Sequence, residues 1–390
     1  MIDAPLPSRD RLTELFLAYT RILSPFKHER AMADAVIGHL EALGIAVHED
    51  DTGTRIGGDT GNVWCTVSGQ GNPHIALGAH LDTVVPTDHI EPFLGDDGVF
   101  RNRHRTILGS DDKAAVAALI HATELLQSWG RPFPTYELLF TVCEEIGLVG
   151  SKHFDEKLLK SPFAAEFDSA GPVGGITVKA PSHDTFKATF RGQAAHAGVE
   201  PERGRSAVQA AAKAIAVMEL GRLDDETSAN IGVIHGGVGT NIVPDTCEIQ
   251  GECRSHNEER LARAAAAMVD AIHAGAAQTG VDVDIALVHE YSAFALTGRS
   301  AVVRLSKAAL ADLGLEPQML ASGGGSDANI LNARGLPTVN LTAGMTQVHS
   351  PDEHISLDDL ERLCGVALRL ILMAPEYGPK GRAVVAGDGE

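Results

Sequence analysis

The sequence predicts an α/β protein with a zinc-exopeptidase-like arrangement, in which a mixed, mostly parallel sheet is interrupted by an inserted α+β domain. Strand-like apolar runs alternate with helical patterns over much of the 390 residues, and this alternation is typical of a parallel sheet covered by helices. Between residues 180 and 292 the order of elements becomes βαββαβ, which is typical of a ferredoxin-like domain. We therefore expect one domain formed by 1–179 and 293–390, and an inserted domain at 180–292.

The first domain begins with helices and continues with strands. Residues 10–44 carry two helical patterns separated at Ser24-Pro25, and Gly44 ends the second. Five apolar runs predict strands at 62–67, 74–78, 136–143, 164–167 and 337–341. Three helical patterns lie at 112–127, 327–332 and 357–373. In sheets of this kind, ligands collect beyond the carboxyl ends of the strands.

The inserted domain is expected to contain four strands with two helices on one face of the sheet. The predicted strands are 184–191, 229–235, 246–254 and 281–289. The predicted helices are an alanine-rich stretch at 201–221 and a longer one at 258–280. None of the candidate metal ligands falls within these residues.

Composition excludes several classes of partner. The formal net charge of −20 disfavours binding to nucleic acid or to an anionic membrane. No stretch of 18 uninterrupted apolar residues is present, and the first residues lack a signal-peptide pattern. Five cysteines without a CxxC pair are typical of reduced thiols. We expect a soluble protein of the cytoplasm.

Imidazole and carboxylate side chains follow several of the predicted strands. They are His80, Asp82, Glu144, Glu145, Asp168 and, one loop later, His349. Nitrogen and oxygen donors without a thiolate match a hydrolytic site with two zinc ions. Their shared place at strand ends supports a common site independently of residue type.

Two acidic motifs have simpler interpretations when they are taken alone. His80 and Asp82 form a His-x-Asp pair in which the carboxylate could orient the metal-binding ring, although most such pairs are loop residues. Asp111 and Asp112 precede a helix and could serve only as its acidic N-terminus. One of these two carboxylates could instead bridge two metal ions.

The adjacent acids Glu144 and Glu145 are more informative. Two neighbouring carboxylates after an apolar strand repel each other unless a cation lies nearby. Because neighbouring side chains diverge, one can bind metal while the other reaches a water molecule and acts as general base. The alternative is an ordinary surface turn.

Signatures of other enzyme classes are absent from the sequence. It contains no HExxH, GxxxxGK[ST] or GxSxG motif, and no GxGxxG motif after a strand. A glycine-rich segment centred on Gly324 precedes a helix and could accept an anion on backbone N–H groups. Because it lacks the lysine of a phosphate loop, a substrate carboxylate is the expected anion.

Taken together, the motifs resemble the di-zinc exopeptidase and deacylase family that includes peptidase T, carboxypeptidase G and acetylornithine deacetylase. The similarity extends from residue 61 to residue 349 in the order of the family. The segments that carry it are GAHLDTV at 78–84, LGSDDK at 108–113, TVCEEIG at 141–147, FD at 167–168 and QVHS at 347–350. The segment TILGSDDK is most similar to the peptidase T-like branch.

This resemblance implies two zinc ions per chain, with Co²⁺ or Mn²⁺ as alternatives. His80 and Asp168 would hold one zinc ion, and Glu145 and His349 the other. Asp111 would bridge the two ions.

The resemblance also implies roles in catalysis and in substrate binding. Glu144 would be the general base and Asp82 the acid that orients a ligand. His196 in the inserted domain would reach the active site of a partner chain and stabilise the oxyanion, which implies a homodimer formed through that domain. Asn241 and Arg254 resemble substrate-binding positions.

The predicted function is therefore metal-dependent hydrolysis of amide bonds in small peptides, by a peptidase T-like di- or tripeptide aminopeptidase. The alternatives are an N-acyl-amino-acid deacylase or a carboxypeptidase, because these motifs do not separate peptide from N-acyl substrates. A catalytically inactive binding protein of the same fold is a further alternative. The presence of Glu144 argues against it, since a binding protein does not need a general base.

Overall fold

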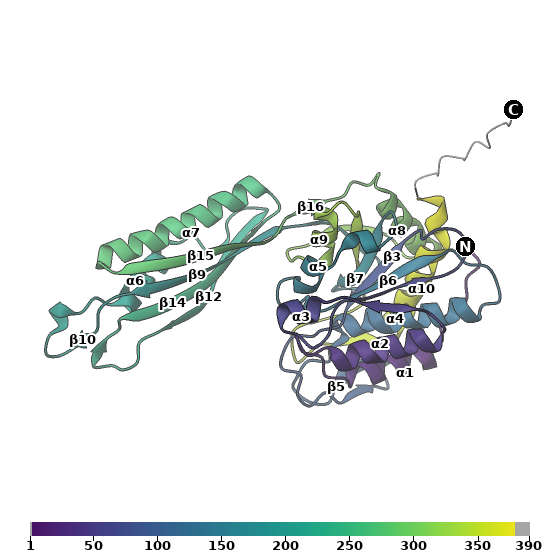
Figure 1. Ribbon diagram of the computed structural model, residues 1–390, viewed down its shortest axis with the longest axis horizontal. Helices are drawn as coiled ribbons and strands as arrows, with labels where there is room; N and C mark the ends of the chain where they lie inside the picture. Colours follow the sequence, from purple (N-terminus) through teal and green to yellow (C-terminus); the bar gives the residue numbers. More distant parts are fainter. Residues whose placement is uncertain (1, 379–390) are drawn as a thin grey trace. The chain divides into compact units, whose positions relative to one another are not determined.

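The computed structural model describes residues 2–378, which form two compact units (Figure 1). Unit 1 comprises the chain up to Val178, Leu296–Leu320, and the part from Ser326 onward. Unit 2 comprises Lys179–Ala295 and the short segment Ala321–Gly325. The predicted insertion, 180–292, falls within the first stretch of unit 2. Among the described residues, no helix combines the length and apolar character that a membrane crossing requires.

The main sheet has the strand order β1-β2-β6-β3-β7-β18-β8-β16, with β17 beside β8. Parallel pairing joins the four central strands β6, β3, β7 and β18. The pairs β1–β2 and β2–β6 at one edge, and β18–β8 and β8–β16 at the other, are antiparallel. The sheet is thus mixed, and its parallel part is smaller than the sequence pattern indicated. The strands are β1 (Val47–Glu49), β2 (Val63–Val67), β3 (Ala76–His80), β6 (Tyr136–Thr141), β7 (Ala164–Ser169), β8 (Gly175–Ala180), β16 (Phe294–Ala295), β17 (Gln318–Ala321) and β18 (Thr338–Thr342).

Three of the four central strands are buried along their whole length. Every residue of β3, β6 and β18 is buried, and burial on both faces explains why β3 and β6 are mostly apolar. The helices of unit 1 are α1 (Arg9–Thr20), α2 (Arg30–Ala42), α3 (Thr52–Ile56), α4 (Ser110–Ser128), α5 (Val149–His153), η1 (Glu156–Leu158), α8 (Ala301–Asp312), α9 (Asp327–Ala333), α10 (Leu357–Met373) and η3 (Ala374–Glu376).

Helix α4 is the central helix of unit 1, and it carries Asp111 at its start. It packs against α1, α10 and β3, and its residues from Ser110 to Thr123 are all buried. Burial on all sides explains why this helix is rich in alanine and has no polar face. A small sheet, β19-β5-β4, consists of β4 (Pro92–Leu94), β5 (Val99–Asn102) and β19 (Ile355–Ser356).

Unit 2 is built on an antiparallel sheet of order β11-β12-β14-β9-β15. Helices α6 and α7 pack on it and on each other, and a separate apolar core lies between them and the sheet. Apart from the two-residue strands β10, β11 and β13 and the short turn η2, the order β9-α6-β12-β14-α7-β15 matches the predicted βαββαβ order. The elements are β9 (Ser182–Arg191), β10 (Ala195–His196), η2 (Pro201–Arg203), α6 (Ala207–Val217), β11 (Gly221–Arg222), β12 (Thr227–Gly236), β13 (Ile242–Val243), β14 (Thr246–Ser255), α7 (Glu258–Thr279) and β15 (Asp282–Tyr291).

The prediction of one helix over 201–221 was wrong at both ends. Residues Pro201–Arg203 form a separate 3-10 turn, and α6 begins only after Ser206, whose hydroxyl accepts a hydrogen bond from the N–H of Gln209. A capping serine defines a helix start more strongly than a run of helix-forming residues before it. At the other end the backbone becomes extended at Met218.

Candidate metal centre

The central strands bring the predicted ligands to one edge of the main sheet. His80 is the last residue of β3, and Asp168 is the fifth residue of the neighbouring strand β7. Glu145 lies four residues beyond the end of β6, on the other side of β3. Asp111 comes from the start of α4, and His349 from the loop after β18. Since β6, β3, β7 and β18 are parallel, their carboxyl ends meet at this edge.

The five predicted ligands form two groups that share one residue. In the first group, His80 Nε2 lies 3.1 Å from Asp111 Oδ1 and 3.6 Å from Asp168 Oδ1. In the second, His349 Nε2 lies 3.3 Å from Asp111 Oδ2 and 3.0 Å from Glu145. Within each group the candidate ligand atoms lie within 4.8 Å of one another. The two oxygens of Asp111 therefore face different groups.

The charges of these groups depend strongly on one another. Burial opposes the charged form of His80, but hydrogen bonds to Asp111, Asp168 and Asp82 outweigh it and raise the pKa of the ring well above its usual value. Burial also opposes ionisation of Asp111, but hydrogen bonds from His349 and His80 lower its pKa.

The pKa values of Asp168 and His349 are also raised. Burial, together with the charge of Asp111, raises the pKa of Asp168 to about 7. Hydrogen bonds to Asp111 and Glu145 raise the pKa of His349 to about 10. His80, Asp111 and Asp168 are largely buried, whereas Glu145 is partly buried and His349 is exposed. Such a cluster of imidazoles and carboxylates fits a divalent metal ion, because the cation would neutralise the clustered carboxylates.

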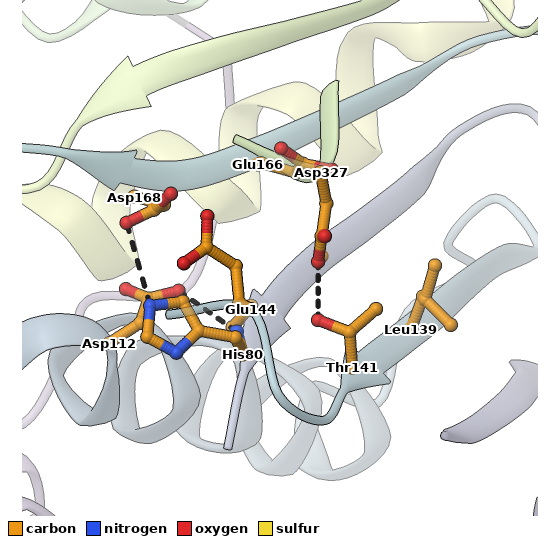
Figure 2. A pocket seen from close by; sticks show the side chains of 10 residues that line it. His80, Asp112, Leu139, Thr141, Glu144, Glu166, Asp168 and Asp327 are labelled. Carbon is orange, nitrogen blue, oxygen red and sulfur yellow. Dashed lines mark hydrogen bonds and ion pairs between the residues drawn. The ribbon is translucent and has the colours of Figure 1, made fainter. Parts of the chain in front are cut away.

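Glu144 faces a small cavity beside the first ligand group (Figure 2). The cavity has a volume of about 10 Å³, which is room for about one water molecule. Burial and the nearby charge of Asp168 raise the pKa of Glu144 well above its usual value. Glu144 belongs to neither ligand group, so its carboxyl group is left for acid–base chemistry.

The same cavity is lined by two acids that the sequence interpretation missed. Glu166 accepts a hydrogen bond from the N–H of Ala328, and Asp327 accepts one from the hydroxyl of Thr141. Glu166 lies between the apolar residues Ala165 and Phe167 within β7, and a buried acid flanked by apolar residues is a signal that sequence reasoning could have used.

Asp82 holds the loop that carries Glu144 and Glu145. Its carboxylate accepts hydrogen bonds from the N–H of Glu144 at 2.9 Å and from that of Glu145 at 3.1 Å. The Nδ1 atom of His80 lies 3.0 Å from the backbone carbonyl of Asp82 and 3.5 Å from its carboxylate. The backbone of Asp82 is thus the nearer partner of the ring, and its carboxylate orients the two acids.

A second buried acid, Glu29, holds the residue just before this pair. Its carboxylate accepts a hydrogen bond from the N–H of Cys143 at 3.0 Å. Burial, together with the charge of Asp82, raises the pKa of Glu29 to about 7. Three consecutive peptide N–H groups, from residue 143 to residue 145, are therefore held by two carboxylates.

The other predicted site residues lie in unit 2. His196 and Asn241 lie at one small two-stranded sheet, in which β10 pairs with β13 and the N–H of Ala197 donates to the carbonyl of Asn241. The side chain of His196 is exposed, and its Nδ1 accepts a hydrogen bond from the N–H of Gly198 at 3.1 Å.

Arg254 and Gly324 lie close together in unit 2. Arg254 donates from Nε and Nη2 to the carboxylate of Glu252, at 3.1 and 3.0 Å, and a Cβ atom added at Gly324 would lie 3.7 Å from Nη1. The N–H of Gly324 already donates to the hydroxyl of Ser322, and that of Gly325 to Tyr291. These two amides could bind an anion only by giving up their present hydrogen bonds. Nη1 of Arg254 lies near the same segment and is the nearer charged donor.

Comparison with known proteins identifies the family. Residues 76–373 match the model of peptidase family M20/M25/M40. An uncharacterised protein of Bacillus subtilis (strain 168), YqjE, is 38% identical over 93% of this chain and 97% of its own length.

Two solved structures are also similar over nearly their whole length. The aminopeptidase PepT from Bacillus cereus ATCC 10987 is 37% identical, with a TM-score of 0.84 over 95% of this chain and 99% of its own. A tripeptidase from Staphylococcus aureus subsp. aureus Mu50 is 33% identical, with a TM-score of 0.89 over 95% of this chain and 100% of its own. These matches confirm the predicted fold class and the resemblance to peptidase T-like proteins. The chain belongs to peptidase family M20/M25/M40 and is a metallopeptidase.

Proposed function

We propose that this protein is an aminopeptidase that uses two metal ions to hydrolyse di- or tripeptides. The observation that carries the proposal is the place of Asp111 in both ligand groups, with Glu144 beside them and in neither. The similar solved structures are described as an aminopeptidase and a tripeptidase, which supports a small peptide as substrate. Five buried free cysteines support a cytoplasmic location.

The metal ligands would divide as the two groups do. His80 and Asp168 would hold one ion, Glu145 and His349 the other, and Asp111 would bridge them. Nitrogen and oxygen donors suit zinc, with Co²⁺ or Mn²⁺ as substitutes.

The proposed mechanism assigns one role to each nearby acid. When bound, two cations would polarise the scissile carbonyl and make a water molecule more acidic. Glu144 takes the proton of that water and passes it to the leaving amine, a role for which its raised pKa is suited. Asp82 holds the backbone N–H groups of both Glu144 and Glu145 and so fixes the loop that carries them. The peptide group would then be bound between the metal ligands and Glu144.

Unit 2 is proposed to bind the substrate and to form a dimer. Arg254, with Nη1 near Gly324, offers a charged donor for the carboxylate of the peptide, and Asn241 offers an amide near His196. Strand β12 is paired on one side only beyond Ala229 and exposes Val233 and Ile234, at 45% and 54% of their surface. An open apolar edge of this kind suits pairing with a second copy of the chain.

The first test is metal content together with a substrate panel. After metal loading and dialysis, elemental analysis should approach two ions per chain, and chelation should abolish hydrolysis. Asp111→Asn should lose both ions, whereas the exposed Asp352→Asn should retain them as a control. Full hydrolysis by metal-stripped protein would refute the proposal. A panel of dipeptides, tripeptides, N-acyl amino acids and carboxypeptidase substrates separates the alternatives, and hydrolysis of none of them at full metal content would indicate a binding protein.

Metal affinity should rise steeply with pH. A metal ion requires His349 to be neutral and Asp168 to be ionised, but their raised pKa values of about 10 and about 7 keep both protonated in metal-free protein at low pH. Binding must therefore release protons, and more of them at pH 6 than at pH 9. Calorimetric titration with Zn²⁺ in buffers of different ionisation enthalpy counts these protons. An affinity that is constant between pH 6 and pH 9 would contradict this expectation.

A further inference from the structure

A buried carboxylate, Glu353, holds the segment that leads into Asp111. Glu353 is 3% exposed and lies in the loop between β18 and β19. Its Oε2 accepts hydrogen bonds from the N–H groups of Leu108 and Gly109, both at 2.8 Å. Its Oε1 accepts from the N–H and the hydroxyl of Ser110, both at 2.6 Å, and from the N–H of Asp111 at 3.1 Å. Four consecutive peptide N–H groups thus converge on one side chain, as in an anion-binding nest.

The loop that carries Glu353 also carries His349. Thr346 and His354 close this loop through two backbone hydrogen bonds of 2.9 and 3.0 Å. Inside it, the N–H of Glu353 donates to the carbonyl of Ser350. The carboxylate of Glu353 and the ring of His349 therefore belong to one closed stretch of backbone.

Glu353 thereby joins two metal ligands that are far apart in the sequence. Asp111 and His349 both belong to the second ligand group, with Glu145 as its third member. Metal affinity depends on the positions of all ligands to within a fraction of an ångström, so groups that hold the ligands affect binding without touching the metal. The five hydrogen bonds to Glu353 fix the backbone of one ligand against the loop of another.

We propose that Glu353 is a positioning residue that fixes Asp111 and His349 relative to each other and so sets the affinity of the second metal position, held by Asp111, Glu145 and His349. This inference rests on the proposed two-metal function and extends it to a residue outside the ligand set. It explains why a charged side chain is buried beside an acidic site, since its charge is compensated by N–H donors and not by the metal.

The chain supplies a matched control in Glu137. This glutamate is 1% exposed and accepts hydrogen bonds from the N–H groups of Lys160 and Ser161 and from the hydroxyl of Ser161, at 2.6 to 2.9 Å. Like Glu353, it holds a loop through backbone N–H groups and a serine hydroxyl. The loop that it holds carries no candidate ligand.

The experiment compares Glu353→Gln with Glu137→Gln in full-length, metal-stripped protein. Glutamine keeps the size of the side chain but presents an NH₂ donor to N–H groups that need an acceptor. Zn²⁺ is titrated in competition with a chromophoric chelator, and thermal unfolding is followed in parallel. We expect Glu353→Gln to lower the affinity for the second equivalent of zinc by about 10- to 100-fold. The affinity for the first equivalent should stay nearly unchanged. Glu137→Gln should lower the unfolding temperature while both equivalents bind as in the wild type.

Activity provides a second readout. Raising the free zinc concentration should restore kcat of Glu353→Gln toward the wild-type value with little change in KM. Ser110→Ala removes one hydrogen-bond donor to Glu353 and leaves the charge of Glu353 in place. This variant should also lower the affinity for the second equivalent of zinc, but by less than Glu353→Gln. This variant keeps the test decisive if Glu353→Gln does not fold.

The outcomes separate this inference from the proposed function. Wild-type protein that binds fewer than two zinc ions would refute the two-metal function itself, whatever Glu353 does. Two equivalents bound as tightly by Glu353→Gln as by the wild type would refute the positioning role alone. An equal loss of zinc affinity in Glu137→Gln would show that the effect follows general stability and would overturn the positioning role. If Glu353→Gln does not fold, unchanged zinc binding by Ser110→Ala would overturn it as well.

Discussion

Replacing Glu144 by glutamine should lower turnover by about a hundredfold or more while both metal ions stay bound. The substitution keeps the shape of the side chain and removes its ability to take a proton. Glu144 lies beside the first ligand group but belongs to neither, so the loss should fall on kcat and not on metal content. Steady-state kinetics on the best substrate, together with elemental analysis of the same sample, measures both quantities.

Two neighbouring acids serve as controls for this substitution. Glu145→Gln should lose metal from the second group, because Glu145 lies 3.0 Å from His349 Nε2 in that group. Glu166→Gln changes another buried acid that lines the same cavity, and it should retain more activity than Glu144→Gln. If metal is lost from Glu144→Gln and kept by Glu145→Gln, the roles assigned to the two acids are reversed.

The ligand groups could be predicted because strand ends are visible in the sequence. Apolar runs place His80, Glu145 and Asp168 at carboxyl ends of strands, and parallel strands bring such ends to one edge. Asp111 and His349 lie on other elements, so the residues alone named them only as candidates, and the resemblance to a known family supplied their specific roles. Their shared geometry required the structure, since a contact between side chains more than 200 residues apart leaves no periodic pattern in a sequence.

The residues that hold the ligands were beyond sequence reasoning for a similar reason. Glu353 follows Pro351 and Asp352 in a polar loop, where an acid is expected to be solvated. Its burial follows from contact with a segment more than 240 residues away. Glu29 precedes a helix, so it resembles an ordinary acidic helix start. In each case the carboxylate binds backbone N–H groups, and such groups have no signature in the sequence.

The parallel part of the main sheet was overestimated for a different reason. Runs such as 62–67 and 74–78 have similar apolar composition, yet β2 is antiparallel to its neighbour β6, and β3 is parallel to it. Strand direction depends on the path of the connecting segments, and apolar composition reports only burial.

His196 has the chemistry of an oxyanion donor, although no candidate ligand lies in its unit. Its Nδ1 accepts a hydrogen bond from the N–H of Gly198, so the neutral ring carries its proton on Nε2. That exposed N–H is free to donate to a developing oxyanion, a contribution worth about 10²- to 10³-fold in kcat. In the proposed dimer, the ring would serve the active site of the partner chain.

Mixing two inactive variants should therefore restore activity. In a dimer of one His196→Ala chain and one Glu144→Gln chain, the site in the first chain retains its own Glu144 and receives an intact His196 from its partner. Random exchange makes about half of the dimers mixed, each with one complete site, so about a quarter of all sites should recover. Activity is measured before and after exchange, and differently tagged chains report the fraction of mixed dimers. Mixed dimers without recovered activity would show that each chain uses its own His196 or none, because only a residue supplied by the partner can complement in this way.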